Sequence, residues 1–374
     1  MKGPKISIIF LVLIFISCGT SSDDSETTIT ILETSDETTT SVQNSEAVVE
    51  DDSENVNTVI GYEFDVDKMS PFTGLELPAE TWLKRPRRAI AFKIDNNINA
   101  RPQSGLQEAD AVHEILVEGG MTRFLAFFLD NSSKYLGPIR SARPTDPTMV
   151  RPYGGTLVVS GATDGLIPSI RELGVPVLEE QSSPTMFRIT TRKAPHNLYA
   201  DTELVREKIN DKGFYFLQPG PQPLYSFGLD QNSWTSNANR VTVKYSDFTT
   251  VIWKLDDGKY SRFIIDSYSD SDEAVAHNFI TQEGNTDILT SETIVVLQGA
   301  LYKDAATTLP SVLTVGVGKA YVFNNGQSIE GTWRRGDINE SFVLTDNQGN
   351  LIQVPPSSQW VHILPNEGEI TVNN

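Results

Sequence analysis

The chain has 374 residues, 39% of them hydrophobic, a formal net charge of -19 at pH 7 and one cysteine. The negative charge argues against nucleic acid and anionic lipid as general partners, because both are polyanions. A lone cysteine excludes an internal disulfide and metal sites that need several thiolates. We therefore expect a protein that is held together by its hydrophobic core, with no cofactor and no metal.

The N-terminal residues have the layout of a secretory signal. Two lysines precede an apolar run over residues 6–16, and Ser17 and Cys18 follow it. The run is shorter than the roughly 20 apolar residues of a membrane-spanning helix. The stretch FISC resembles the lipobox of bacterial lipoproteins, with phenylalanine in place of the usual leucine. We expect a signal peptide over residues 1–18 and a lipoprotein that is anchored in the cell membrane by a lipid such as palmitate on Cys18, facing the extracytoplasmic side.

Residues 19–60 differ in composition from the rest of the chain. They contain eleven acidic residues, many serines and threonines, and no lysine or arginine. Such a segment buries too little apolar surface to offset the entropy lost on ordering, and its like charges repel one another. The composition predicts a disordered acidic tether between the membrane and the folded part.

The remaining chain is long enough for two domains. A stretch rich in proline and glycine at residues 217–228 indicates the boundary between them. The charge also changes: residues 84–151 carry eleven basic and seven acidic side chains, whereas residues 221–374 carry nine basic and eighteen acidic ones. We expect an N-terminal domain over residues 61–218 and a C-terminal domain over residues 222–374.

The first domain begins with an apolar strand that ends at Asp95. Two further apolar runs flank Gly119 and Gly120, which is a strong signal for a β-hairpin. The first of these runs is apolar on both faces, so it is expected in the centre of the sheet, and Glu114 and Glu118 are expected on one face of it, where they need partners. A buried strand, two helices and their loops follow. This order predicts an α/β domain with a mixed sheet.

The second domain consists of short alternating runs that are separated by Asn-Gly, Gly-Lys and Gln-Gly turns. This pattern is typical of an all-β domain, either a sandwich or a barrel. The chain as a whole is therefore expected to be α+β.

The sequence lacks the common catalytic signatures. We find no zinc-binding H-E-x-x-H, no G-x-S-x-G nucleophile motif and no phosphate-binding G-x-x-x-x-G-K. The four histidines lie far apart along the chain. His196 stands out because it lies in a predicted loop beside Lys193 and Asn197, and loops on rigid scaffolds often carry function.

Residues 137–144, GPIRSARP, place Arg140 and Arg143 three positions apart. In one hypothesis these arginines neutralise Glu114 and Glu118 in a buried network. In the other they form a site for a carboxylate or phosphate, because guanidinium groups bind such groups through two parallel hydrogen bonds. The predicted ligand-binding residues are Arg101, Arg123, Arg140, Arg143, His196 and Asn197.

Several stretches together look like the YerB family of bacterial lipoproteins. They are RPRRAIAFKIDNNINARPQ, LGPIRSARP, RKAPHNLY and, near the end, GKAYVFNNGQSIEGTWRR. The resemblance covers both predicted domains. It implies an N-terminal and a C-terminal domain behind a lipoprotein signal, with no established biochemical function.

Three functions remain open at this point. The first is binding of an anionic cell-envelope component, or of a wall-synthesis partner protein, through a basic cleft of the N-terminal domain. The second is a hydrolase or transferase acting on a cell-wall glycan or peptide, with Glu118, Asp95 or His196 as the acid or base. The third is a non-enzymatic structural adaptor. We favour the first and lean away from an enzyme.

Overall fold

The computed structural model describes residues 64–373, except residues 66, 84–87, 215–220, 229–233 and 267–272. The predicted signal peptide, Cys18 and the acidic tether lie outside the described residues. Every described residue belongs to one compact unit. In this described part, no helix is both long and apolar enough to cross a membrane.

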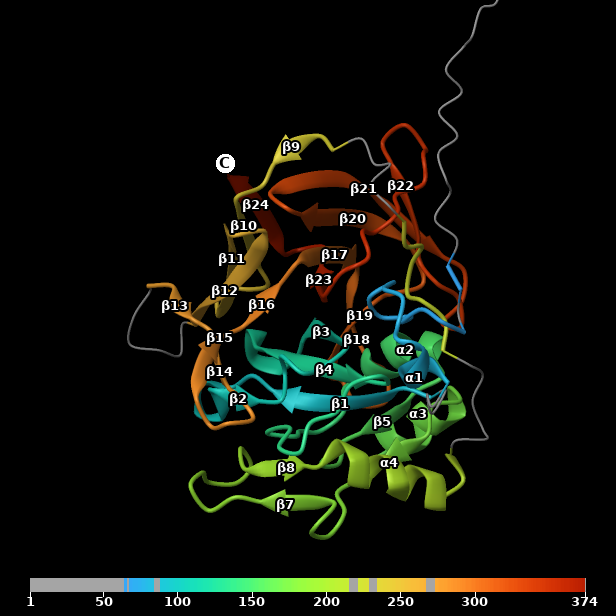
Figure 1. Ribbon diagram of the computed structural model, residues 1–374, viewed down its shortest axis with the longest axis vertical. Coiled ribbons are helices and arrows are strands. Elements are labelled where there is room, and N and C mark those ends of the chain that lie inside the picture. Colours follow the sequence, from blue (N-terminus) through green and yellow to red (C-terminus); the bar gives the residue numbers. More distant parts are fainter. Residues whose placement is uncertain are drawn as a thin grey trace, which may run out of the picture. The chain divides into compact units, whose positions relative to one another are not determined.

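The fold is α+β and is dominated by one long mixed sheet, which runs from β22 near the top of Figure 1 down to β5 and β6. In spatial order its strands are β22 (Val343–Asp346), β21 (Gln327–Arg335), β20 (Gly316–Asn324), β17 (Thr293–Gly299), β23 (Gln359–Pro365), β3 (Ala111–Leu116), β4 (Thr122–Phe128), β1 (Ile90–Asp95), β5 (Thr156–Val158) and β6 (Val177–Leu178). The short strand β9 (Ser236–Asn237) pairs with β21.

Strands from the two halves of the sequence meet in the middle of this sheet. β23 runs parallel to β3, with Trp360 opposite Val112 and Ile363 opposite Ile115. All residues of both strands are buried. One continuous sheet therefore joins segments on both sides of the stretch at residues 217–228.

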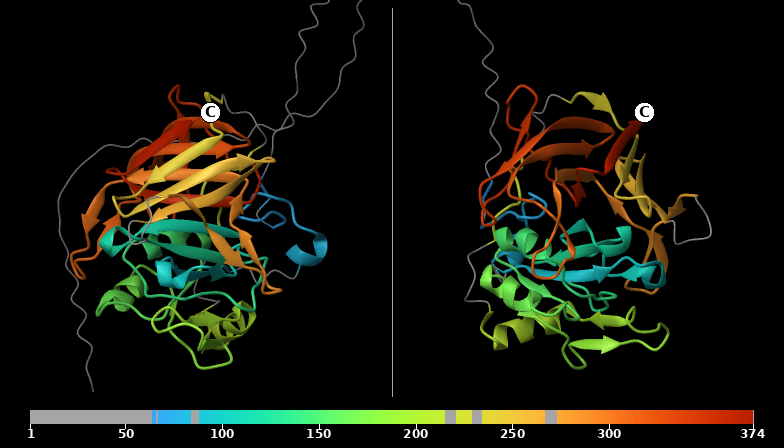
Figure 2. Two further views of the ribbon diagram at one scale, coloured as in Figure 1. Left: turned by 90° about the vertical axis from the view of Figure 1, so that its left-hand side faces the viewer. Right: turned by 180° about the vertical axis from the view of Figure 1, so that it is seen from behind.

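A second sheet of six strands packs over part of the long one, as the left view of Figure 2 shows. It contains β13 (Val275–Ala276), β12 (Lys259–Asp266), β11 (Thr249–Asp256), β10 (Arg240–Lys244), β24 (Glu369–Asn373) and β16 (Thr290–Ser291). The smaller sheets are β15 (Thr286–Ile288) with β14 (Asn278–Ile280) and β2 (Gln103–Ser104), β18 (Leu301–Lys303) with β19 (Pro310–Val312), and β7 (Met186–Arg188) with β8 (Leu198–Ala200).

Short helices complete the fold. The α-helices are α1 (Ala79–Trp82), α2 (Asp146–Val150), α3 (Leu166–Glu172) and α4 (Thr202–Asp211), and the 3-10 helices are η1 (Ile98–Ala100), η2 (Glu118–Gly120) and η3 (Arg151–Tyr153). α4 begins after the N-cap residue Asp201, whose side chain accepts hydrogen bonds from the backbone N–H groups of Glu203 and Leu204.

The central strands bury both of their faces. Ala91, Leu125 and Phe127 belong to one apolar cluster, which α2 and α3 also join. The alternate residues Phe92 and Phe124 belong to a second cluster, with β10, β11 and α4. The prediction of a central strand that is covered on both sides is confirmed, so each polar side chain on these strands needs a buried partner or a place at the end of a strand.

The predicted hairpin is also present. β3 and β4 pair antiparallel, and Leu116 lies opposite Thr122. The connection is longer than two residues, because η2 forms between the strands. Gly119 and Gly120 have φ angles of 70° and 71°, a conformation that favours glycine.

Candidate functional site

Asp95 lies at the carboxyl end of β1, which runs parallel to β5. The segment that leads to Arg140 passes along this end of the strand: Asp95 N–H donates to the carbonyl of Pro138, and Arg140 N–H donates to the carbonyl of Lys93. On the other side of β1, Asp95 lies opposite Arg123 of β4. The carboxyl ends of parallel strands commonly carry binding sites in such sheets.

Asp95 holds two cationic or potentially cationic side chains. Its Oδ2 atom lies 3.1 Å from Nε of Arg140 and 2.7 Å from Nδ1 of His196. Asp95 is 3% exposed, whereas the side chains of Arg140 and His196 are 20% and 18% exposed. In the described part of the chain, Nη1 and Nη2 of Arg140 and Nε2 of His196 have no protein partner, and none of these nitrogens is buried.

A second ion-pair group lies beside the first. Glu118 accepts hydrogen bonds from Nε of Arg143, at 2.5 Å, and from Nη2 of the same residue, and it lies 3.4 Å from Arg123. Desolvation acts to raise the pKa of Glu118, but the hydrogen bonds from Arg143 and the two positive charges lower it to about 2. The guanidinium groups of Arg123 and Arg143 both donate to the carbonyl of Ser141, so they are held side by side.

The closeness of these cations affects Arg123. Desolvation, followed by the charges of Arg143 and Arg140, lowers the pKa of Arg123 to about 10. Arg123 still remains a cation near neutral pH. Several positive charges are therefore concentrated at one end of the central strands.

A fully buried ion pair, Lys93 with Asp146, helps to hold the backbone of Arg143 in place. Nζ of Lys93 lies 2.6 Å from Oδ1 of Asp146, and both side chains are 0% exposed. Oδ2 of Asp146 accepts a 2.7 Å hydrogen bond from the backbone N–H of Arg143. Sequence reasoning missed this pair, although a lysine inside a strand that is predicted to be buried on both faces is itself a signal that a carboxylate lies nearby.

These side chains form what we call the Arg140 cluster: Lys93, Asp95, Glu118, Arg123, Arg140, Arg143, Asp146 and His196. It contains four bases that are cationic near neutral pH and three carboxylates, so it has an excess of one positive charge without counting His196. Nη1 and Nη2 of Arg140 and Nε2 of His196 face solvent. An anion can approach the positive charge of the cluster at these nitrogens.

Six of the predicted site residues are brought together in this way, and two are not. Arg101 donates to the side-chain oxygen of Asn96, at 3.1 Å, and pairs with Asp266 at 2.9 Å, so it lies outside the cluster. The side chain of Asn197 accepts from Arg188 and donates to the carbonyl of Ile189, which fixes the loop rather than facing Arg140. Members of the Arg140 cluster do not line the two pockets of 420 and 650 Å³ found elsewhere in the described residues, so the basic cleft stays a prediction.

The hypothesis that Arg140 and Arg143 neutralise Glu114 and Glu118 is correct for one pair only. Arg143 does pair with Glu118, but Arg140 pairs with Asp95. Glu114 accepts two hydrogen bonds of 2.8 and 2.9 Å from Arg262. β3 ends at Leu116, so strand alternation does not extend to Glu118, which lies in η2 and turns toward Arg123.

Glu114 belongs to a buried network that links the two halves of the chain. Thr122 and the indole N–H of Trp360 also donate to its carboxylate, at 2.7 and 3.1 Å. Desolvation acts to raise the pKa of Glu114, but the charge of Arg262 holds it below its ordinary value. Arg262 further contacts Nδ1 of His277, whose Nε2 lies 2.9 Å from Gln103. The network is structural, because all six side chains are buried.

Within the described ranges, no group of three or more histidine, cysteine, aspartate or glutamate side chains is arranged to hold a metal ion. The contacts within the Arg140 cluster are ion pairs and hydrogen bonds.

Comparison with known proteins places the chain in a sequence family. Residues 72–215 match the family described as "Protein of unknown function (DUF3048) N-terminal domain", and residues 240–361 match the corresponding C-terminal domain. A protein of Bacillus subtilis (strain 168) named "Putative lipoprotein YerB" is 27% identical over 302 residues, which cover 79% of this chain and 86% of the relative. The crystal structure of YerB from the same organism has a similar fold, with a TM-score of 0.66 and 24% identity over 81% of this chain and 99% of that chain.

Proposed function

Because the chain belongs to the YerB family of two-domain proteins, we propose that it is a lipid-anchored envelope protein that binds an anionic group through the Arg140 cluster. The anion would belong to a cell-envelope component or to an envelope protein. The name of the Bacillus relative supports membrane association. Anchoring through Cys18 and an extracytoplasmic location are parts of the proposal.

We also propose that residues 61–218 and 222–374 are the two domains, with an α/β and an all-β character. The two family matches, which fall within these ranges, support the division. The shared sheet between β3 and β23 would then be the interface of the domains.

The observation that supports binding best is the way Arg140 is held. Asp95 lies 3.1 Å from Nε in an ion pair that lacks hydrogen-bond geometry, and the end of the guanidinium group, with Nη1 and Nη2, has no protein partner in the described structure. That end offers two parallel N–H donors, which suit a carboxylate or phosphate. Because the side chain is 20% exposed and fixed by Asp95, binding would lose less side-chain entropy than at a freely mobile surface arginine.

Thermal unfolding of the full chain in detergent tests this proposal. Inorganic phosphate and N-acetyl-D-alanine serve as phosphate and carboxylate probes. We expect an active probe to raise the midpoint of wild-type protein, since a ligand at about 100 times its Kd adds about 2.7 kcal/mol of stability. The R140Q variant should lose the shift.

The matched control is R171Q, which removes an arginine that is half exposed and paired with Glu179 on the surface. It should keep the full shift. If neither probe stabilises the wild-type protein, or if R140Q responds as the wild type does, the proposed anion site is wrong.

One observation favours the enzyme hypothesis as a second candidate. Asp95 contacts Nδ1 of His196 and leaves Nε2 open to solvent, which is the arrangement in which a carboxylate orients a general base. Water or a substrate hydroxyl would supply the proton, because no described hydroxyl contacts Nε2. If the protein is an enzyme, it will release products from cell-wall glycan or peptide fragments, and D95N will slow that release by about 100-fold or more. If the protein leaves cell-wall glycan and peptide fragments unchanged, the enzyme hypothesis is wrong.

A further inference from the structure

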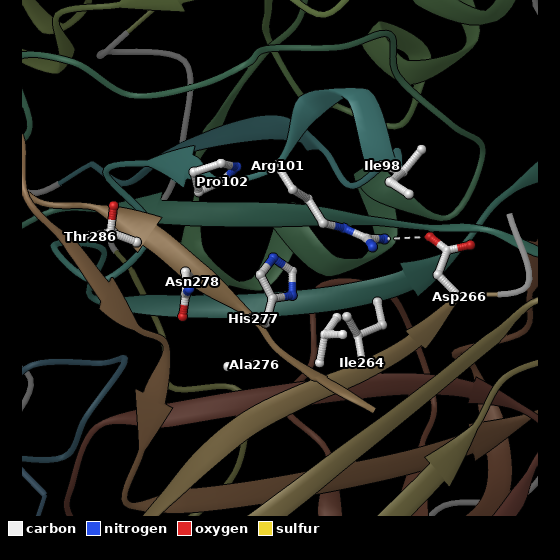
Figure 3. Close-up of a pocket in the computed structure, with 10 residues that line it drawn as sticks. Ile98, Arg101, Pro102, Ile264, Asp266, Ala276, His277, Asn278 and Thr286 are labelled. Atoms are coloured by element: carbon white, nitrogen blue, oxygen red, sulfur yellow. Dashed lines mark ion pairs between the residues drawn. The ribbon is translucent and has the colours of Figure 1, made fainter. Parts of the chain in front are cut away.

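A separate pocket of 420 Å³ lies where η1 and the two residues that follow it in the first half meet residues of β12, β13, β14 and β15 in the second half (Figure 3). Its lining residues are Ile98, Arg101, Pro102, Ile264, Asp266, Val275, Ala276, His277, Asn278 and Thr286. None of these belongs to the Arg140 cluster. The volume is within the range that holds a small ligand, about 300–1,000 Å³.

One polar group of the pocket is a fixed hydrogen-bond donor. Nε of Arg101 donates to Asn96, and Nη2 donates to the carbonyl of Asn96 and pairs with Asp266, the contact drawn as a dashed line in Figure 3. Nη1 has no protein partner among the described residues and is not buried. Its two N–H groups are therefore available to a ligand that enters the pocket.

Asn278 provides a second polar group. It lies beside His277 in Figure 3, and its side-chain amide has no hydrogen-bond partner in the described part of the chain. An amide offers one donor group and one acceptor, which is the pattern that a peptide group complements. His277 offers no such group, because Arg262 and Gln103 occupy its two ring nitrogens.

The pocket has no net charge. The charge of Asp266 balances that of Arg101 at 2.9 Å. Burial, followed by the charges of Arg262 and Arg101, holds the pKa of His277 well below its ordinary value, so its ring is neutral. A ligand that carries a net charge would lose hydration here without gaining an unbalanced opposite charge.

Apart from Thr286, the rest of the lining is apolar. Ile98 and Val275 are 40% and 55% exposed at the rim, and Ile264 is buried. An aliphatic side chain that covers Ile98 and Val275 would remove apolar surface from water on both partners, at about 25 cal/mol per Å².

We propose that this pocket binds a short neutral peptide segment, with its aliphatic side chain against Ile98, Ile264 and Val275. A peptide carbonyl accepts from Nη1 of Arg101, and a neighbouring peptide group pairs with the amide of Asn278. The proposal is independent of anion binding at the Arg140 cluster, because the two sites share no residue.

Calorimetric titration of the full chain in detergent tests the proposal with two probes. One is the capped dipeptide N-acetyl-valyl-alanine amide, which is neutral, and the other is the same dipeptide with a free C-terminal carboxylate. We expect saturable binding of the neutral probe and affinity for the free acid that is weaker by about tenfold or more.

Three variants separate the contributions. A276F fills the pocket from the short edge strand β13, and R101K keeps the charge that pairs with Asp266 but lacks Nη1. Each should weaken binding of the neutral probe by about tenfold or more. A306F places the same ring at an exposed alanine in the β18–β19 connection and should bind within about twofold of the wild type.

Several results would overturn the proposal. They are the absence of saturable binding of the neutral probe at millimolar concentration, equal or tighter binding of the free acid, and wild-type affinity in A276F. Loss of phosphate binding in R140Q would not affect these results. The peptide site and the anion site are therefore tested independently.

Discussion

At the scale of single residues, the Arg140 cluster depends on a lysine with no access to water. Desolvation lowers the pKa of Lys93 to about 8, while its contact with Asp146 opposes the shift. K93M would leave the carboxylate of Asp146 buried without its cation and should lower the free energy of unfolding by about 3–5 kcal/mol.

The double variant K93M/D146N is the matched test of that explanation. The introduced amide can still accept the backbone N–H of Arg143, and no charge remains buried. Urea unfolding should show that the double variant regains most of the lost stability. A single variant as stable as the wild type would mean that the ion pair contributes nothing.

The pair of Glu118 and Arg143 makes stability depend on acid pH. The folded-state pKa of Glu118 is about 2, below its ordinary value of 4.5. The stabilisation is therefore fully present above pH 4.5 and is lost as the pH falls toward 2. Glu118 is 38% exposed, so the effect is reduced to about 1 kcal/mol.

The variant E118Q should accordingly be less stable than the wild type at pH 7 and equally stable near pH 2. Denaturant unfolding across this range measures the difference. If the difference in free energy of unfolding between E118Q and the wild type does not change with pH, the ion pair of Glu118 is not the source of the pH dependence.

His113 is a buried residue without a compensating contact. Both of its ring nitrogens lack hydrogen-bond partners among the described residues, and its ring lies 4.5 Å from that of Phe127. Burial lowers its pKa to about 3, so the unfolded chain binds more protons between pH 3 and 6.5 and stability rises with pH over that interval.

The variant H113F removes the unsatisfied nitrogens and should raise the free energy of unfolding at pH 7 by about 1 kcal/mol. It should also flatten the rise between pH 3 and 6.5. If H113F is destabilised by several kcal/mol, the imidazole of His113 forms a stabilising hydrogen bond in the folded protein, contrary to this prediction.

At the scale of the elements, local signals were sufficient for several predictions. Alternation and apolar runs predicted the central strands, and Gly119 and Gly120 predicted the hairpin, because such features depend on neighbours in sequence. Chain order also indicated that a strand ends at Asp95 and that His196 lies in a loop.

The partner of Glu114 could not be predicted in the same way. Arg262 lies 148 positions away, and the parallel pairing of β3 with β23 has no local signal. The side-chain direction of Glu118 depends on where β3 ends, which a pattern locates only to within a few residues. These contacts therefore depend on the pairing of strands far apart in the sequence and could not be predicted from local patterns.

The N-cap of α4 gives a prediction for an element. Oδ1 of Asp201 accepts from the N–H groups of Glu203 and Leu204 at 2.9 and 3.3 Å. D201A should lower the free energy of unfolding by about 1 kcal/mol and D201N by less, because asparagine is also a good N-cap. Equal losses in the two variants would show that the cap is not the cause.

At the scale of the whole molecule, the shared sheet implies that the two halves unfold together. Residues 112–115 of β3 pair with residues 360–363 of β23, and the Glu114 network adds a buried connection between the halves. Their backbone amides should exchange with the same free energy of opening in hydrogen-exchange experiments, close to that of global unfolding. Much lower protection of β23 than of β3 would contradict this.

The same organisation separates the two candidate sites. The Arg140 cluster is built from the first half alone, whereas the 420 Å³ pocket is lined by residues of both halves. Binding at the pocket would therefore stabilise the junction between the halves, while binding of an anion would act on the carboxyl end of β1.

The most direct test of the central claim is a crystal structure of the protein with phosphate or N-acetyl-D-alanine bound. We predict that the anion accepts hydrogen bonds from Nη1 and Nη2 of Arg140 at about 2.7–2.9 Å, with His196 at its side. An anion that is bound elsewhere at full occupancy, with the end of Arg140 still facing solvent, would contradict the account.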